Sequence, residues 1–453
     1  MVVPRSDNRL ALLDQAFYES HRAVGQKEVM QVGWLYERPV DLDGLTRFHA
    51  NLANGLLGRR IERSPLPFGR HRWVWDAQPS TLDITTETRP RAELGDWFDE
   101  RTQLPIDPES GPAWRLSVVP LNDGATAISL VLSHYVIDGI GGAVAVTEAI
   151  LGMTRELGYP RPRARTRVRG VVQDARETLR EAPAVARAFV AAVKEARRRR
   201  TDQDRPATPR QNVTYVADVD TPVTAPSVWI RIELDQWNTR AATLSGTGST
   251  LAAAFTAQLD RNMGRRHGHA EGIPTLLTVN DRTTADDARA VAVSFTRVGV
   301  DPAELTTDLS AARGAIKDAL VRFKESEDAT AQLVPLTPFT PKRGWQQLIE
   351  YALTDPEQPA VCSNLGDTGP AAIRPDGTLC DAAFARGASQ HLTQRWLRRI
   401  GSQLHVYYGT AMEINQVGIY VCAYHPDSVT SRAQLRELAT RTVAEFGLTA
   451  AIE

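Results

Sequence analysis

The sequence lacks the features that mark several large classes of protein. Its 453 residues include only three cysteines, Cys362, Cys380 and Cys422, and these form no C-x-x-C pair. Neither a disulfide framework nor a thiolate metal site is therefore indicated. Lysine and arginine number 53 against 54 for aspartate and glutamate, a balance that argues against nucleic acid as a partner. No run of about 18 uncharged apolar residues occurs, and the N-terminal stretch lacks the apolar segment of a secretory signal, so we expect a soluble cytoplasmic protein.

What is present is enough apolar sequence, 42% of the residues, for two or three domains. Residues 1–160 and 213–453 both mix strand-like and helix-like segments, so two α+β lobes are the simplest prediction. Residues 161–212 form a basic connector with one long helical run, which we expect to be interrupted or kinked near Pro183. That helix either covers the lobe junction as a solvated surface or docks on an acidic partner or a membrane surface, where contact would be at most peripheral.

One segment of the first lobe, "AISLVLSHYVIDGIGGAVAV" (127–146), could carry chemistry. Strand-like residues 112–121 and 127–134 are joined by a turn, and a helix is predicted from Gly141 to Leu157. Glycines between a strand and a helix could cradle a phosphate. However, the third glycine of G-x-G-x-x-G would fall on Val144, and Asp138 would repel the phosphate. A phosphate site is therefore not favoured.

The same segment offers a general base. Because side chains alternate along a strand, His134 shares a face with the apolar residues of 127–134. Partial burial there favours a neutral imidazole, which can accept a proton near neutral pH. Asp138 lies in the turn, next to Gly139, which permits a tight backbone, and it bonds either to turn amides or to a distant cation. The alternative is a histidine with a structural role only.

The stretch "SHYVIDG" (133–139) resembles the H-H-x-x-x-D-G motif of the acyl-CoA-dependent acyltransferase superfamily. This superfamily includes non-ribosomal peptide condensation domains, polyketide-associated acyltransferases and bacterial wax ester synthase/diacylglycerol acyltransferases. His134 matches the second, catalytic histidine, and Asp138 and Gly139 match the D-G. Ser133 departs from the pattern by replacing the first histidine.

Further segments resemble the same superfamily in the same order, over about residues 9 to 370. They are "RLALLDQAFYESH" (9–21), similar to the "LSPLDRAF" of the wax ester branch; "LPIDPESGPAWRLSVVPL" (104–121), similar to "PLD…GPLWR"; "TVNDRT" (278–283), similar to "VNGRP"; and "VCSNLGD" (361–367), similar to "SNLG" or "SNVPGP".

The resemblance implies two chloramphenicol-acetyltransferase-like lobes in a V-shaped pseudo-dimer, with a central tunnel. It implies an acyltransferase that moves an acyl group from a thioester of coenzyme A or a carrier protein to an alcohol or amine. His134 would act as general base, with no acyl-enzyme and no bound cofactor. The absence of a G-x-S-x-G elbow agrees with this scheme. Ester formation is favoured because the N-terminal segment leans to the wax ester branch.

Other site residues follow from the same resemblance. Asp138 is expected to pair with Arg282, as a structural link between the lobes. Asn280, Ser363 and Asn364 either bind substrate at the junction or only shape turns. Ser133, at the first motif position, is a further candidate for substrate binding.

Two alternatives stay open. The chain could be a stand-alone condensation or cyclisation enzyme for a carrier-bound natural-product intermediate, with the basic connector docking the acidic carrier. It could also be a catalytically silent binding or assembly homologue, because the first motif histidine is replaced. No metal site is expected, since His267 and His269 lie in a polar loop without a carboxylate at ligand spacing.

Overall fold

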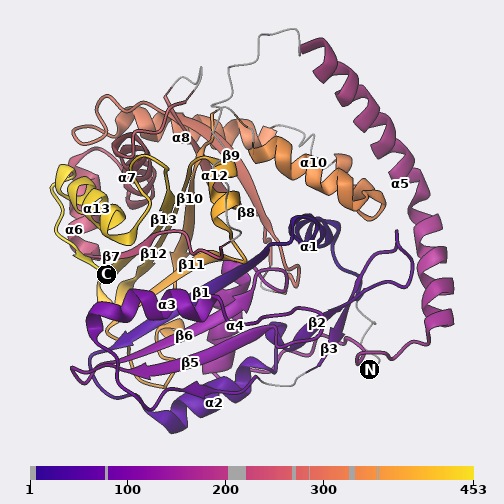
Figure 1. Cartoon of the computed structure of the whole chain (residues 1–453), viewed down its shortest axis with the longest axis horizontal. Helices are drawn as coiled ribbons and strands as arrows, with labels where there is room; N and C mark the ends of the chain where they lie inside the picture. Colours follow the sequence, from indigo (N-terminus) through magenta and orange to yellow (C-terminus); the bar gives the residue numbers. More distant parts are fainter. Residues whose placement is uncertain are drawn as a thin grey trace.

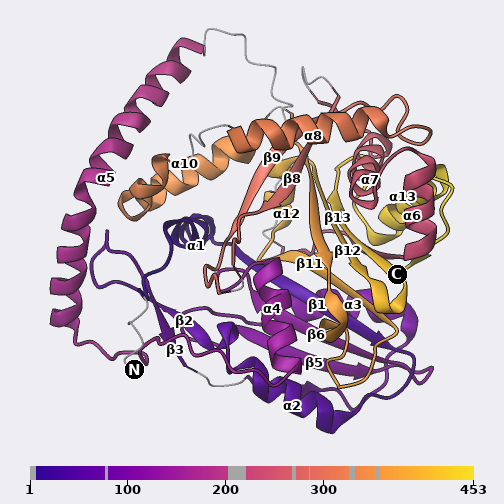
Figure 2. The same cartoon turned by 180° about the vertical axis from the view of Figure 1, so that it is seen from behind.

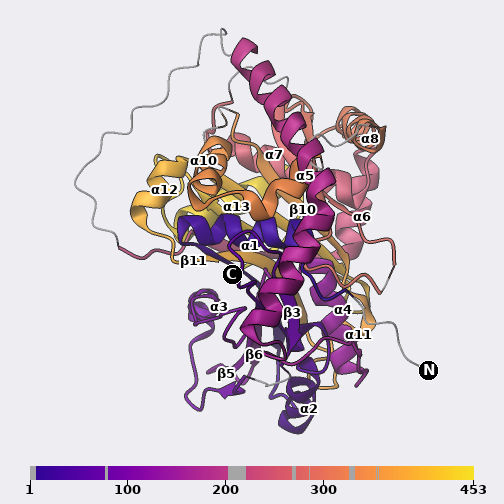
Figure 3. The same ribbon diagram turned by 90° about the vertical axis from the view of Figure 1, so that its right-hand side faces the viewer.

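The computed structural model describes residues 7–76, 80–202, 221–267, 272–284, 286–325, 332–353, 355 and 357–453, without the side chains of 195–202 and 353. The chain forms two α+β lobes, each built on a mixed β-sheet (Figure 1). Figure 2 shows the lobes from behind, and in Figure 3 one lobe lies above the other. The two-lobed α+β architecture predicted from the sequence is confirmed.

The first lobe contains a five-stranded sheet in the order β11-β1-β6-β5-β4. Its strands are β1 (Lys27–Tyr36), β4 (Asp83–Ile84), β5 (Trp114–Pro120), β6 (Thr126–Ser133) and β11 (Ala382–Gln390). Its other elements are α1 (Leu12–Val24), α2 (Leu42–Leu52), η1 (Leu56–Gly58), the hairpin β2 (Arg59–Glu62) and β3 (Arg72–Trp75), η2 (Arg91–Glu93), α3 (Leu94–Thr102) and α4 (Gly139–Ile150). The side chains of α2 and α4 pack on one face of the sheet and those of α3 on the other. All eight residues of β6 are buried, because this central strand is covered on both faces.

The second lobe contains a seven-stranded sheet in the order β14-β7-β13-β12-β10-β8-β9. Its strands are β7 (Ser227–Glu233), β8 (Ile273–Asn280), β9 (Val293–Val300), β10 (Ala360–Asp367), β12 (Gln403–Ala411), β13 (Gln416–Tyr424) and β14 (Ala451–Ile452). Its helices are α6 (Leu234–Thr243), α7 (Gly248–Asn262), α8 (Ser310–Glu325), η3 (Val334–Phe339), α10 (Lys342–Leu353), α11 (Gly369–Ala372), α12 (Gln394–Ile400), η4 (Met412–Ile414) and α13 (Arg432–Glu445). Helix α7 is buried from Thr250 to Asp260 and forms the centre of this lobe's core.

A strand exchange joins the lobes. Strand β11 lies in the second half of the sequence, yet it pairs antiparallel with β1 of the first sheet, with Val32 opposite Ala385. The ring of Phe384 on β11 packs 4.9 Å from that of Trp229 and 4.8 Å from that of Tyr420, both of the second lobe. Segment 213–453, predicted as the third domain after 1–160 and 161–212, therefore contributes to both sheets.

The connector forms one long helix, α5 (Arg167–Asp202), which continues through Pro183. Of the two alternatives predicted at Pro183, the interruption is wrong, whereas a kink agrees with the change of direction that the helix shows near its middle (Figure 1). Its first half is tied to the first lobe by ion pairs, including Asp174 with Arg72 at 3.0 Å and Glu181 with Arg70 at 2.9 Å. No helix among the described residues combines the length and apolarity that crossing a membrane requires.

Helix α4 is shorter than predicted. It ends at Ile150 rather than Leu157, and Gly152 then adopts a left-handed conformation with φ of 66°. Leu157 still packs against the core of the first lobe, but from an irregular segment. The apolar spacing from 146 to 157 therefore does not correspond to a continuous helix, and Met153 within it is exposed.

Candidate active site

His134 lies where the central strand of the first sheet gives way to a turn. Ser133 ends β6 opposite Val29 of β1, and the His134 N–H donates to the Glu28 carbonyl at 3.0 Å. The imidazole is only partly buried and packs edge-on against Phe17 of α1, with ring centroids 5.0 Å apart. Its Nδ1 atom is buried and has no partner of hydrogen-bond geometry among the described residues. Packing therefore holds the ring more than side-chain hydrogen bonds do.

The surroundings of His134 favour its neutral form. Burial lowers its pKa below the ordinary value of 6.5, while backbone oxygens of the turn and the charge of Asp138 partly oppose the shift. A neutral imidazole at the lobe junction can accept a proton from a bound hydroxyl or amine.

The sequence alone did not single out His21, a second imidazole beside His134. His21 lies near the end of α1, and its ring packs 4.6 Å from that of Phe17, the same ring that contacts His134. Its Nδ1 bonds to the Phe17 carbonyl at 2.9 Å, and burial, together with His134, lowers its pKa. The i, i+4 spacing of Phe17 and His21 was the available signal, because it puts both on one helix face.

Glu28 was also missed. It lies at the start of β1, half-buried, and its carboxylate accepts a hydrogen bond from the Ser389 hydroxyl of β11 at 2.6 Å. Burial raises the pKa of Glu28 to about 7. Among the described side chains, none forms an ion pair with it. A charged residue opening an apolar strand was the only sequence signal.

Asp138 has both of the roles that the sequence left open: it bonds to backbone amides and it pairs with a distant cation. It is the N-cap of α4: Oδ1 accepts from the Gly141 N–H at 2.8 Å, and Oδ2 accepts from the Ala292 N–H at 2.8 Å. The expected ion pair with the second lobe is also present, since Arg282 Nη2 lies 2.7 Å from Asp138 Oδ1. Both charged side chains are nearly inaccessible to solvent.

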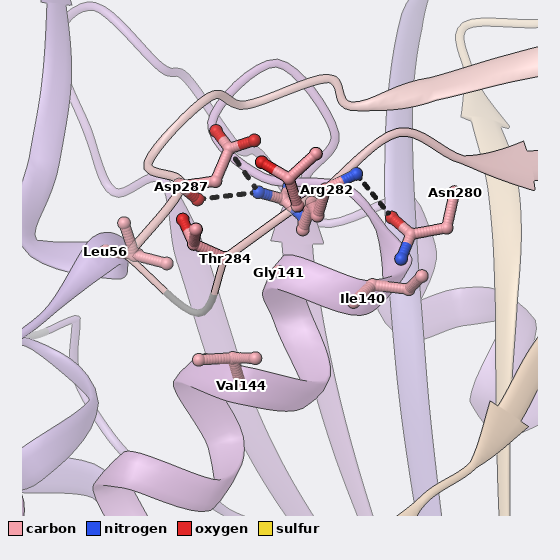
Figure 4. Close-up of a pocket in the computed structure, with 9 residues that line it drawn as sticks. Leu56, Ile140, Gly141, Val144, Asn280, Arg282, Thr284 and Asp287 are labelled. Atoms are coloured by element: carbon pink, nitrogen blue, oxygen red, sulfur yellow. Dashed lines mark hydrogen bonds and ion pairs between the residues drawn. The ribbon is translucent and has the colours of Figure 1, made fainter.

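Arg282 begins a loop of the second lobe that is docked on the first. Its guanidinium also donates to the carbonyl oxygens of Asp287, at 2.7 Å, and Arg289, at 3.1 Å. Asn280 accepts from the Arg282 N–H at 3.0 Å, so it shapes this turn, and it also lines a cavity of about 260 Å³ beside α4 (Figure 4). In Figure 4 the start of α4 lies directly below the loop.

Close packing, and not an unusual backbone, explains the motif glycines. Neither Gly139 nor Gly141 has a left-handed φ, so the expectation that Gly139 serves a tight backbone is wrong. A Cβ on Gly139 would lie 3.2 Å from Leu365 of the "SNLG" segment, and one on Gly141 would lie 3.0 Å from Arg282 Nη2. Gly139 and Leu365 also line a mostly apolar cavity of about 70 Å³ between α4, β1 and β11.

The remaining candidates divide between the two sides of the sheets. Ser363 pairs in register with Tyr407 of β12, on the sheet face opposite the second-lobe core. Asn364 points to the other face, where it donates to Ser249 of α7 at 3.0 Å and accepts from the Gly366 N–H at 2.9 Å, so it shapes a turn. Ser133 is 1% exposed and lies on the face of β6 opposite His134. The structure therefore brings Ser363, but neither Asn364 nor Ser133, towards the lobe junction.

The loop that carries His267 in the second lobe is held by the carboxylate of Asp260, which the sequence spacing did not suggest as a partner. His267 Nε2 lies 2.6 Å from Asp260 Oδ1 at the end of α7, and burial and this partner act on its pKa in opposite senses, with a net rise. His269 lies outside the described residues. Within the described part of the chain, no group of three or more His, Cys, Asp or Glu side chains could hold a metal ion.

The fold is similar to that of solved structures named as condensation domains and as acyltransferases. The structure is similar to the first condensation domain of the calcium-dependent antibiotic synthetase in complex with a substrate analogue (TM-score 0.57, 14% identity, 98% of this chain and 96% of that one). It is similar to the wax ester synthase/diacylglycerol acyltransferase from Marinobacter aquaeolei VT8 (0.54, 13%, 97% and 98%). It is also similar to the trichothecene 15-O-acetyltransferase from Fusarium sporotrichioides (0.56, 12%, 97% and 94%).

The likeness covers nearly the whole of each chain, which confirms the two-lobed α+β fold that the motif resemblance implied. At 12% to 14% identity it concerns the fold alone. No protein-family model matches the sequence. No curated protein matches it either.

Proposed function

We propose that this protein is an acyltransferase that moves an acyl group from a thioester to an alcohol or amine, with His134 as general base. The observation that carries the proposal is His134 itself: a partly accessible imidazole, four residues before the Asp138 that pairs with Arg282 of the second lobe, with a lowered pKa and an Nδ1 atom that has no hydrogen-bond partner among the described residues. The names of two structural relatives, an acyltransferase and an acetyltransferase, support the reaction class.

The reaction needs only one proton carrier. His134 takes the proton of the acceptor hydroxyl or amine as that atom attacks the thioester carbonyl. When the tetrahedral intermediate collapses, the C–S bond breaks and the protonated imidazole returns the proton to the departing thiolate. A positioned base contributes on the order of 10² to 10⁴ in rate, and proximity between the lobes must supply most of the rest. The donor thioester, from coenzyme A or a carrier protein, is a co-substrate, and no bound cofactor takes part.

Partly accessible side chains between the lobes support a passage to His134. Glu28, Tyr407 and Cys422 all retain exposed surface, although burial raises the pKa of each. We assign the apolar cavity beside Gly139 to the acyl chain. Its volume of about 70 Å³ favours a short chain, since a cavity of about 150 Å³ is what benzene occupies in an engineered protein.

Ester formation is the favoured outcome. The two acyltransferases among the structural relatives carry names that describe the acylation of hydroxyl groups. The N-terminal segment 9–21, which resembles the wax ester branch, also supplies Phe17 and His21 next to His134. A hydroxyl acceptor is therefore the first to test.

The test is a thiol-release assay with purified protein, a panel of acyl-CoAs, and alcohols and amines as acceptors. We expect release that depends on the acceptor and is lost in His134→Ala but kept in the control His425→Ala, which lies in a surface hairpin of the second lobe. Both variants should unfold at the wild-type temperature. Full activity of a folded His134→Ala would refute the proposal, and no transfer with any donor would favour a catalytically silent binding homologue.

A second candidate, condensation on a carrier-bound intermediate, is favoured by one surface. Helix α5 presents exposed arginines that could dock an acidic carrier protein: Arg167, Arg169, Arg176, Arg180 and Arg187. The likeness to a condensation domain agrees with this candidate. Thiol release from carrier-bound thioesters but not from acyl-CoAs, weakened by Arg176→Glu and Arg180→Glu together, would establish it over the first candidate.

A further inference from the structure

We infer that Glu28 is an acceptor-binding residue, and that the acceptor carries a cationic nitrogen a few bonds from its nucleophile, as in an amino alcohol. This inference rests on the proposed function, because it names the acceptor class for the reaction at His134. It concerns a residue that the H-x-x-x-D-G motif does not contain.

Glu28 is the cross-strand neighbour of His134. The register of β1 with β6 places Val29 opposite Ser133, and the next step along both chains places Glu28 opposite His134. The hydrogen bond from the His134 N–H to the Glu28 carbonyl, 3.0 Å long, fixes that step. Directly opposite residues point to the same face with Cβ atoms about 5 Å apart. One compact molecule can therefore contact both side chains.

Within the part of the chain that the structure describes, the carboxylate of Glu28 forms no ion pair that would neutralise it. Besides the imidazole of His134, whose lowered pKa keeps it neutral, the groups that face it are polar or weakly acidic: the Ser389 hydroxyl, which donates to it, and Tyr135, Tyr407 and Cys422. The nearest basic side chain in sequence, Lys27, donates to the Ile106 carbonyl at 3.1 Å.

Arg386 of the adjacent strand is also engaged elsewhere. It pairs with Asp99 at 2.7 Å, on the opposite face of the sheet. A half-buried carboxylate without a counter-charge is costly to ionise. A ligand cation would remove that cost.

The two substrates would bind at different positions along the face of β1 that carries Glu28. Side chains at alternate positions share this face, and further along it Val32 and Trp34 line the apolar cavity assigned to the acyl chain. The acidic group and the apolar cavity thus lie at different positions along one face of β1, with Glu28 near the start of the strand. An uncharged acyl chain fits the apolar cavity, and a cationic acceptor fits the position beside Glu28.

The ionisation of Glu28 gives the inference a pH signature. Burial raises its pKa to about 7, so the carboxylate that attracts a cation is present above that pH and disappears as the pH falls through it. A preference for cationic acceptors should follow the same curve. Ser389→Ala removes the hydrogen bond that stabilises the carboxylate, so it should move the midpoint to higher pH.

The experiment compares 2-(dimethylamino)ethanol with its neutral isostere 3-methylbutan-1-ol, which both offer only a hydroxyl for acylation. The quantity measured is the ratio of kcat/KM for the two acceptors, with acetyl-CoA as donor, in wild type, Glu28→Gln and the control Glu93→Gln. Glu93 is exposed on η2 and lies outside the site. We expect a ratio of about 10 to 100 in wild type, the value of a charge-assisted hydrogen bond, which falls towards one in Glu28→Gln and is kept in Glu93→Gln.

A binding measurement keeps this test separate from the proposed function. Calorimetric titration of both compounds into His134→Ala, with and without Glu28→Gln, needs no turnover. Tighter binding of the cation that depends on Glu28 supports the inference even if no acyl transfer is found, in which case only the proposed reaction fails. Equal affinities for the two compounds, or a preference that survives Glu28→Gln, would overturn it.

Discussion

The replacement of Asp138 by asparagine tests how the two lobes are held around His134. The wild-type side chain is 1% exposed and accepts hydrogen bonds from Gly141, Ala292 and Arg282 at 2.7 to 2.8 Å. Asparagine keeps the size but removes the charge, and its NH₂ group must face one of these donors. The Arg282 side chain, 8% exposed, would retain its charge with Asp287 as the nearest remaining carboxylate, at 4.0 Å.

Breaking a buried ion pair by removing one partner costs about 3 to 5 kcal/mol of unfolding free energy. A domain of some 200 residues loses roughly 2 to 4 °C in Tm per kcal/mol. We therefore expect Asp138→Asn to lower the Tm by about 6 to 20 °C if the lobes melt separately. Urea unfolding followed by tryptophan fluorescence, together with calorimetry, would measure both quantities.

The control is an ion pair at the surface. Glu413 lies 2.7 Å from Arg374 with both side chains about 40% exposed, so Glu413→Gln should cost less than about 1 kcal/mol. A double-mutant cycle with Arg282→Gln should give a coupling of about 1 kcal/mol or more between Asp138 and Arg282. Wild-type stability of Asp138→Asn, or additive effects in the cycle, would refute the reasoning.

Three other predictions concern the site. Burial lowers the pKa of His134, and a general base must be neutral. We therefore expect kcat/KM to stay high as the pH falls through 6.5 and to be lost only below the lowered pKa. A midpoint above 6.5 in the pH profile would contradict the role of His134 as general base. Ala143→Leu fills the apolar cavity and should shift the preference towards acetyl-CoA within a series up to octanoyl-CoA, and an unchanged series would place the acyl chain elsewhere. The pKa of Glu28 is raised from 4.5 to about 7, so the wild type loses stability as the pH rises across that interval. Glu28→Gln should then be more stable than wild type at alkaline pH, by up to about 3 kcal/mol before solvent screening reduces it, and equal urea midpoints would show that the carboxylate is not desolvated.

The parts of the site that the sequence predicted are those set by local geometry and by the motif. Strand alternation was enough to orient His134, and a carboxylate just before a helix is an ordinary N-cap, which is the position of Asp138. The pairing of Asp138 with Arg282, 144 residues further on, came only from the order of segments in the resemblance. Nothing in the spacing of these residues indicates their contact.

The pairing of β11 with the sheet of the first lobe could not be predicted from local sequence patterns. Strand β11, "AAFARGASQ", is rich in alanine and glycine, which have low strand propensity. Its Arg386 can be buried because it donates hydrogen bonds to Gln31 and Ser227 and forms an ion pair with Asp99. Its pairing with β1 joins residues more than 340 positions apart. Such a strand is specified by its neighbours in the folded protein.

The errors on helices have different causes. A proline inside a helix removes one hydrogen bond and disfavours continuation, but the carbonyl freed by Pro183 belongs to Leu179, which is exposed, so water can bond it. For α4, burial of Leu157 produced a helical spacing by coincidence, and the left-handed Gly152 ended the helix first. His21 and Glu28 were overlooked because neither belongs to the motif, and only the packing of α1 and β1 brings them to His134.

The contacts of Asp138 explain why a costly buried ion pair lies four residues from His134. The loop that carries Arg282 is also held by Asp14 of α1, which accepts from the Ala290 and Val291 N–H groups at 3.1 and 2.8 Å. Helix α1 presents Phe17 to the His134 ring as well. The position of the imidazole therefore depends on the same three segments that join the lobes: α1, the turn after β6, and the loop after β8. An apolar pair at Asp138 and Arg282 could match the ion pair in stability, but it could not cap α4 or bind the Ala292 amide. Because the charged pair also fixes this geometry, variants at Asp138 or Arg282 should lose the orientation of the His134 ring as well as stability.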